Sequence, residues 1–230
     1  MRSRLAVLAS GGGSNLQAIL DHADALGARA SYEVVLVAAS APTAGALARA
    51  GARGLAACAL ADPADAGAVD ALLRAHDVDL VALAGYLKLV PAAVTQRFHG
   101  RMLNVHPALL PAFGGPGMYG RRVHAAVLAH GARVSGVTVH FVDELYDHGA
   151  VAAQWPVPVL GRDTPETLAA RVLRAEHQLF PRVIDAVAAG RLALGADGRV
   201  RAADGASPES TFTLVEGTAP PAGLDLLLTS

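Results

Sequence analysis

Short apolar segments alternate with segments of helical pattern through the first half of the chain, and this alternation restricts the folds open to it. The apolar segments are residues 4–10, 33–40, 55–60, 79–85 and 101–106. Between them, apolar residues recur at helical spacing in residues 14–26, 43–52, 65–77 and 90–98. Strands that are apolar almost throughout and separated by helices are typical of a parallel sheet covered on both faces. The pattern predicts an α/β fold with a mostly parallel sheet and helices on both faces.

The pattern changes after residue 131. Residues 133–143 and 150–159 are two longer strand candidates with a short connection, which predicts an antiparallel pair. A long helix is expected from Asp163 or Thr164 to about Ala189, because Pro165 and Glu166 favour a first helical turn. Residues 192–201 then predict a hairpin around an Asp-Gly turn.

Glycine, proline, serine and alanine dominate the sequence beyond residue 203, and the periodicity fades. We therefore expect one domain over residues 1–203 and a C-terminal tail over residues 204–230. Within that tail, residues 210–217 have the pattern of an additional edge strand.

Composition excludes several classes of protein. The chain has 230 residues, of which 53% are hydrophobic, enough for one α/β domain with a substantial core. A formal net charge of −1 gives no attraction to nucleic acid or to an anionic membrane. The one cysteine, Cys58, rules out an intrachain disulfide, and no apolar run approaches the roughly 20 residues that span a bilayer. These features indicate a soluble, cytoplasmic protein.

A glycine-rich loop, SGGGSN at residues 10–15, joins the first predicted strand to the first predicted helix. Its backbone N–H groups and the positive end of the helix dipole can receive an anion, and Ser14 and Asn15 can cap the helix or donate to a phosphate oxygen. Dinucleotide-binding loops require glycine where Leu16 stands, and ATP-binding loops require a lysine that this region lacks. The loop is therefore either a site for one phosphate group or a turn that lets the helix pack closely on the sheet.

Asn104 and His106 are polar residues at the end of the fifth predicted strand. Alternate strand residues share a face, so these two side chains project together while Leu103 and Val105 face the other side. Ligands of open parallel sheets bind beyond the carboxyl ends of the strands. The sequence therefore predicts one crevice shared by the glycine loop, residues 84–90 and this polar pair.

Four motifs, in this order along the chain, resemble the folate-dependent glycinamide ribonucleotide formyltransferases. They are VLASGGGSNLQAI at residues 7–19, AGYLKLV at 84–90, LNVHPALLPAFGGPGMYG at 103–120 and VHFVDELYDHGAVAAQ at 139–154. The resemblance covers about residues 4–190. It implies a mixed, mostly parallel seven-stranded sheet with a Rossmann-like N-terminal half. It also implies transfer of the formyl group of 10-formyltetrahydrofolate to the amine of glycinamide ribonucleotide, without a metal, by a monomer or homodimer.

The resemblance also implies roles for individual residues. The catalytic residues are Asn104, His106 and Asp147. The residues around the ribonucleotide are Gly13, Ser14 and Asn15 at the phosphate and Glu176 near the ribose. The residues along the folate are Leu87, Lys88, Leu89, Val90, Asn104, Val142, Asp143 and Glu144. His140 is expected to be a packed strand residue that supports the site.

The chemistry of formyl transfer accounts for the catalytic residue types. Attack of the amine on the formyl carbon creates a negatively charged oxygen, to which the amide of Asn104 and a protonated His106 can donate. His106 is also suited to moving a proton from the amine to the departing folate nitrogen. A carboxylate beside the ring, which is the role of Asp147, favours the protonated form.

The roles of several residues depend on the resemblance or have two interpretations. Without the resemblance, Asp143, Glu144 and Asp147 have the pattern of an ordinary acidic loop. Tyr119, Arg121 and Arg122 either contact phosphate or start a helix. The chain also differs from the family pattern at three places. Ala66 replaces a folate-side arginine, residues 116–120 replace a histidine-containing loop, and His148 replaces a glycine.

Three other functions compete with this one. A methionyl-tRNA formyltransferase is expected to carry an additional basic C-terminal domain, and a formyltetrahydrofolate hydrolase an added N-terminal domain; neither is expected here. A non-catalytic nucleotide-binding module would use the glycine loop alone and would tolerate loss of His106.

Overall fold

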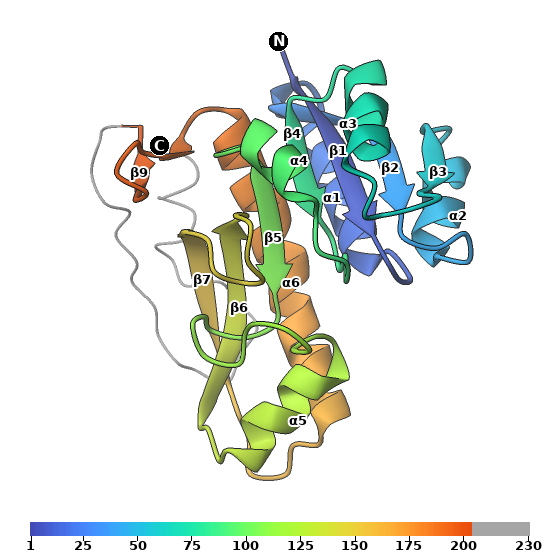
Figure 1. The fold of residues 1–230 in the computed structure, drawn as a ribbon. Coiled ribbons are helices and arrows are strands. Elements are labelled where there is room, and N and C mark those ends of the chain that lie inside the picture. Colours follow the sequence, from blue (N-terminus) through green and yellow to red (C-terminus); the bar gives the residue numbers. More distant parts are fainter. Residues whose placement is uncertain (204–230) are drawn as a thin grey trace.

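The computed structural model describes residues 1–203, so the expected tail and edge strand lie outside the described residues. Within them, seven strands form a sheet in the order β3-β2-β1-β4-β5-β6-β7 (Figure 1). The strands are β1 Ser3–Ala9, β2 Tyr32–Ala39, β3 Ala57–Ala59, β4 Leu80–Leu83, β5 Met102–His106, β6 Val134–Phe141 and β7 Val151–Pro158. The first five run parallel, whereas β6 is antiparallel to both β5 and β7. The predicted mixed, mostly parallel sheet with its antiparallel pair is confirmed.

Helices cover both faces of the sheet. They are α1 Ser14–Leu26, η1 Gly27–Arg29, α2 Gly45–Ala52, α3 Ala66–Ala75, α4 Ala92–Arg97, α5 Arg121–Ala129 and α6 Pro165–Ala188. Buried residues of α1, α2, α5 and α6 join one apolar core, and those of α3 and α4 join a second core. In Figure 1, α6 runs the length of the sheet beside β5, β6 and β7. No helix within residues 1–203 is long and apolar enough to cross a membrane.

The alternation of side chains along β5 determines the face on which Asn104 and His106 lie. Leu103 and Val105 belong to the core that contains α6, whereas Met102 belongs to the core that contains α3 and α4. Asn104 and His106 follow Met102 at intervals of two and therefore share its face. Both side chains stand at the carboxyl end of the strand, as the pattern predicts.

The long helix α6 begins as the sequence predicts. The Thr164 hydroxyl accepts from the Thr167 N–H at 3.3 Å, the Thr167 hydroxyl accepts from the Thr164 N–H at 2.9 Å, and Pro165 is the first helical residue. The predicted hairpin is also present, with β8 at Leu192–Leu194 and β9 at Val200–Ala202. The cap satisfies backbone N–H groups at the start of α6, and the apolar residues of the helix set the face that packs on the sheet.

Replacement of Leu179 tests the packing of α6. Leu179 is fully buried in the core, so Leu179→Ala removes apolar contacts and leaves a cavity. We expect a loss of about 2 to 5 kcal/mol in the free energy of unfolding, measured by denaturant titration. Leu160→Ala, at a position 36% exposed, is the control and should change this energy by less than about 0.5 kcal/mol. Equal losses in the two variants would contradict this packing.

Candidate active site

A cavity of about 670 Å³ lies beyond the carboxyl ends of β1, β4 and β5. The three segments predicted to meet there all line it, represented by Asn15, by residues 85–87 and by residues 104–107. The position corresponds to the point where the strand order reverses between β1 and β4, which is where ligands bind in open α/β sheets. Its opposite wall comes from α5 and α6, so it is a cleft between the sheet end and these helices.

His106, at the end of β5, is 3% exposed and has an acceptor at each ring nitrogen. Its Nδ1 lies 3.4 Å from Oδ2 of Asp147, and its Nε2 donates to the Phe113 carbonyl at 2.9 Å. Both neighbouring atoms are acceptors, and an imidazolium, which donates from both nitrogens, suits them. The structure thus brings together His106 and Asp147, which the sequence could pair only by resemblance.

The carboxylate of Asp147 is held from several sides. It accepts from the Gly115 N–H at 2.9 Å, and Nδ2 of Asn104 lies 3.4 Å away. Burial alone would raise the pKa of this carboxyl. Hydrogen bonding to His106, the positive charge of that ring and the Gly115 N–H outweigh burial and hold the pKa well below its ordinary value. Asp147 is therefore a carboxylate throughout the range in which a histidine titrates.

His140 fixes the amide of Asn104 across the β5–β6 pair. The two residues are register partners, and Nδ2 of Asn104 lies 3.0 Å from Nε2 of His140. The Nδ1 of His140 donates to the Phe141 carbonyl at 2.9 Å, so in the neutral ring Nε2 accepts from Asn104. His140 therefore lies against the predicted catalytic residues and orients one of them.

The loop between β6 and β7 is shaped by Gly149. A Cβ added there would lie 1.9 Å from the Phe141 carbonyl oxygen, so only glycine lets the loop return this close to β6. Asp147 itself has φ of 54°, in the left-handed region that aspartate and asparagine tolerate better than most residues. His148, a departure from the family pattern, is exposed and pairs with Asp143 at 2.6 Å. It therefore leaves the surroundings of Asp147 free.

The structure contradicts the expectation that Ser14 and Asn15 cap α1. Ser14 and Asn15 do not cap α1, because Gly13 occupies the N-cap position with φ of 75° and no side chain caps the helix. A Cβ on Gly13 would lie 2.7 Å from Cα of Ala46, so this residue also permits close packing on α2. Gly13 thus permits close packing of the loop on α2 rather than on the sheet, and the N-terminus of α1 stays uncapped by side chains.

Asn15 and Glu176 meet across the cleft. Nδ2 of Asn15 donates to Oε2 of Glu176 at 2.7 Å, although the two residues are 161 positions apart. Burial raises the pKa of the Glu176 carboxyl, and the bond from Asn15 and the charge of His106 only partly offset it. The contact joins α1 to α6 and places Glu176 in the same cleft as His106.

The residues predicted to lie along the folate do not all line the same cavity. Leu87, Lys88 and Leu89 are exposed, and Leu87 lines the main cleft, whereas Val90 is buried in the core. Val142, Asp143 and Glu144 instead line a smaller cavity of about 320 Å³, which Glu144 helps to close by accepting from Gln96 at 2.6 Å. The structure therefore does not gather these residues into one cavity, and the side chain of Val90 faces away from both.

Sequence reasoning missed the role of α5 in the cleft. His124 is buried, lines the cleft, and has an Nδ1 without a partner among the described residues. Burial, followed by the charge of His106, lowers the pKa of its imidazole. Arg121 begins α5 and pairs with Glu166 at 2.5 Å, so this segment starts a helix. No local pattern distinguishes His124 from an ordinary helix histidine.

Comparisons with known proteins agree with this arrangement. Residues 3–184 match the family described as formyl transferase. The chain is 45% identical over 204 residues to the chloroplastic phosphoribosylglycinamide formyltransferase of Arabidopsis thaliana, covering 86% of this chain and 69% of that protein. It is 38% identical to the trifunctional purine biosynthetic protein adenosine-3 of Bos taurus, of which it spans only 20%. The crystal structure of glycinamide ribonucleotide transformylase 1 from Symbiobacterium toebii superposes with a TM-score of 0.78 at 40% identity, covering 87% of this chain and 94% of that one.

The raised pKa of Glu176 has a consequence for stability. A folded-state pKa above the unfolded value contributes stability that is present below the unfolded pKa, near 4.3, and is lost as the pH rises through the folded pKa. Glu176→Gln keeps an acceptor for Asn15 but removes the ionisation. We expect unfolding titrations to show similar stability at pH 4 and a more stable variant at pH 7.5. Glu166→Gln is the control: the pKa of this exposed carboxyl is lowered, so any change should have the opposite sign. A Glu176 variant that is less stable at pH 7.5 would contradict the burial argument.

Proposed function

Since this chain belongs to the formyl transferase family, we propose that it transfers the formyl group of 10-formyltetrahydrofolate to the amine of 5′-phosphoribosylglycinamide in purine biosynthesis. One observation carries the catalytic part of the proposal. Three side chains that formyl transfer requires meet on the wall of a cleft, where Asn104 and His106 each lie 3.4 Å from the carboxylate of Asp147. The co-substrate is a folate, and no metal takes part in the proposed reaction.

The negative charge that develops on the formyl oxygen is stabilised by two donors. When the amine attacks the formyl carbon, Nδ2 of Asn104 and Nε2 of His106 donate to that oxygen, each worth about 3 to 4 kcal/mol in such sites. Nδ2 of Asn104 lies 3.0 Å from Nε2 of His140 and 3.4 Å from Asp147, and Nε2 of His106 donates to the Phe113 carbonyl at 2.9 Å. Substrate binding thus exchanges an internal acceptor for the formyl oxygen at each donor.

The imidazolium of His106 gives its Nε2 proton to the departing folate nitrogen, and the neutral ring then takes up the proton lost by the attacking amine. Shuttling of this kind contributes about 10² to 10⁴ in rate. Asp147 stays ionised and holds the ring by Nδ1, so that Nε2 faces the reacting atoms. The bond from the amine nitrogen to the formyl carbon forms first and gives a tetrahedral intermediate. The bond to the folate nitrogen then breaks as that nitrogen is protonated, and no covalent enzyme intermediate is required.

The two substrates contact different residues around Asn104, His106 and Asp147. Gly13, Ser14 and Asn15, at the uncapped N-terminus of α1, hold the phosphate, and Glu176 accepts from the ribose. The folate lies along Leu87, Lys88 and Leu89 and reaches toward Val142, Asp143 and Glu144; the exposed leucines and the second cavity support this path. Val90 supports that segment from the core rather than by contact.

The catalytic domain in this proposal is residues 1–203. The protein acts in the cytoplasm as a monomer or homodimer, with small molecules rather than nucleic acid or membranes as its partners. Its nearly neutral charge and single cysteine support these assignments.

Turnover in vitro tests the reaction. Mixing the protein with 5′-phosphoribosylglycinamide and a 10-formyl folate should change the folate absorbance and yield the formylated amide. His106→Ala should lower kcat/KM by about 100-fold or more, because it removes both a donor and the proton shuttle. His76→Ala, outside the cleft, is the control and should retain activity. No turnover by the wild type, release of formate without the amine, or full activity in His106→Ala would refute the proposal.

Asp147→Asn tests the carboxylate by itself. Asparagine tolerates the left-handed backbone at this position and keeps an acceptor for the Gly115 N–H, so the loop should remain in place. Loss of the charge should lower kcat by about 100-fold. Asp77→Asn makes the same change at another aspartate with positive φ, outside the cleft, and should retain activity. Similar kcat values in the two variants would rule out a catalytic carboxylate at position 147.

A further inference from the structure

Three polar side chains stand in one row across the last three strands of the sheet. His106 on β5 is the register partner of Thr138 on β6, and Thr138 is the register partner of Gln154 on β7. Register partners on neighbouring antiparallel strands project from the same face of the sheet. Thr138 is fully buried and Gln154 is half-buried. Two polar residues thus continue the row beyond the histidine, and the proposed reaction gives neither of them a role.

The hydroxyl of Thr138 uses its full hydrogen-bonding capacity next to the segment that follows β5. It accepts from the Leu110 N–H at 3.0 Å and donates to the Ala108 carbonyl at 2.7 Å. It also accepts from Nε2 of Gln154 at 3.0 Å, and the same Nε2 donates to the Leu110 carbonyl at 2.8 Å. A hydroxyl has one donor and two acceptor positions, so all three are occupied. Together the two side chains satisfy both backbone groups of Leu110.

The segment held in this way leads to the backbone groups that contact the predicted catalytic residues. Beyond Leu110, the Phe113 carbonyl accepts from Nε2 of His106 at 2.9 Å. Further along, the Gly115 N–H donates to Oδ2 of Asp147 at 2.9 Å. Both contacts come from the backbone, so they depend on the path of the chain rather than on the side chains at these two positions.

Close packing connects the same segment to β6 and to the carboxylate. A Cβ on Gly136 of β6 would lie 2.6 Å from Cδ2 of Leu109, so the segment rests directly on this strand. A Cβ on Gly114 would lie 2.4 Å from Cδ2 of Leu110 and 3.2 Å from Cβ of Asp147, so Gly114 is in close contact with both. Protein interiors are packed densely enough to transmit such a displacement. A shift at Leu110 therefore reaches Asp147.

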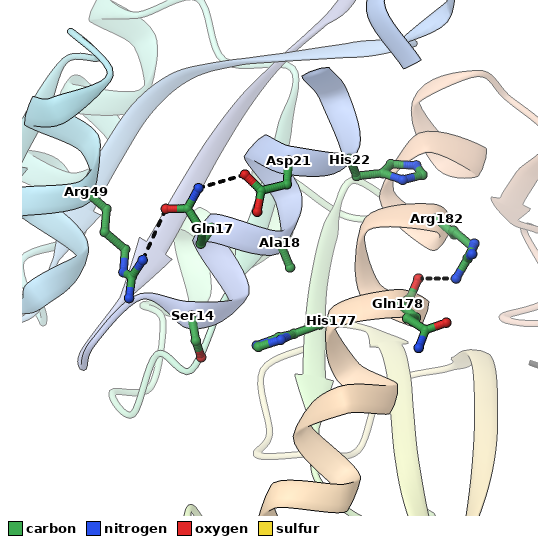
Figure 2. A pocket seen from close by; sticks show the side chains of 9 residues that line it. All are labelled: Ser14, Gln17, Ala18, Asp21, His22, Arg49, His177, Gln178 and Arg182. Atoms are coloured by element: carbon green, nitrogen blue, oxygen red, sulfur yellow. Dashed lines mark hydrogen bonds between the residues drawn. The ribbon is translucent and has the colours of Figure 1, made fainter. Parts of the chain in front are cut away.

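Thr138 and Gln154 lie outside the cavities that the proposed substrates occupy. Neither residue lines the main cleft, which contains His106. Neither lines the polar cavity of about 550 Å³ between α1, α2 and α6, where Figure 2 shows Ser14 and Arg49. An effect of Thr138 or Gln154 on formyl transfer must therefore pass through the segment that they hold.

We propose that Thr138 and Gln154 are positioning residues for formyl transfer. They hold residues 108–115 so that the backbone of this segment meets His106 and Asp147 in the reactive geometry. The inference rests on the proposed function for the identity of the reaction. A displacement of about 1 Å near reacting groups can cost about 100-fold in rate, which is why hydrogen bonds outside the cleft affect turnover. Substrate contacts stay in place, so the effect falls on kcat rather than on KM.

Replacement of the hydroxyl tests the inference by kinetics. Thr138→Val keeps the shape of the side chain but removes the partner of the Leu110 N–H and the Ala108 carbonyl. We expect kcat to fall by about 10-fold to 100-fold, with each KM changed by less than about 3-fold. Thr138→Ser restores the hydroxyl and should recover most of kcat. Ser135→Ala is the matched control, because it removes a buried hydroxyl of β6 that has no partner among residues 1–203, and it should retain kcat.

Gln154→Met tests the other half of the network. Methionine has a similar length but cannot donate to the Leu110 carbonyl or to Thr138, so kcat should fall by about 3-fold to 10-fold. Because both residues act on one segment, the double variant Thr138→Val/Gln154→Met should lose less than the product of the two single losses. Losses that multiply in full would show two independent effects and would contradict a shared role.

Amide hydrogen exchange of the full chain, followed by NMR at constant pH, tests the segment without turnover. Thr138→Val should speed exchange of the Leu110 and Gly115 amides by about 10-fold or more, whereas Ser135→Ala should leave both rates unchanged. Normal kcat in Thr138→Val, no recovery in Thr138→Ser, a loss that falls on KM, or an equal loss in Ser135→Ala would overturn the inference. If the exchange rates change as expected but the wild type does not transfer formyl groups, the hold on the segment stands and the proposed function fails.

Discussion

The buried carboxylate of Asp147 is the interaction on which the rest of the site depends. A charge can remain ionised at such a position only when donors surround it, and here the donors come from the end of β5 and from the Gly115 backbone. Because Asp147 and Asn104 are 43 positions apart, the contact joins the last parallel strand to the loop of the antiparallel pair. The sheet therefore changes from parallel to antiparallel at the strand that carries the predicted catalytic residues, and this change brings their partner back to them.

The second constraint is the close approach of α1 to its neighbours. Gly13 lets the loop pack on Ala46, and Asn15 then reaches Glu176 on α6. This contact divides the surroundings of the loop into a cleft that contains His106 and a polar cavity that contains Arg49.

The sequence predicted the elements and the direction of their side chains well, because both depend on local patterns. The alternation of side chains in β5 was enough to place Asn104 and His106 on one face. Thr164 and Pro165 were enough to predict where α6 begins. Asp147 could be paired with them only by resemblance, since nothing local marks it among its acidic neighbours. Ser14 and Asn15 were wrongly expected to cap α1, because the cap fell one residue earlier, on Gly13.

The central claim is that the formyl group passes directly from the folate to the amine at Asn104, His106 and Asp147. The most direct test is a rapid-quench single turnover with excess protein, 5′-phosphoribosylglycinamide and a folate whose formyl carbon is ¹³C. The account predicts that the label leaves the folate and enters the amide product at the same rate, with none on the protein. Label found as formate, or attached to the protein before it reaches the amine, would contradict it.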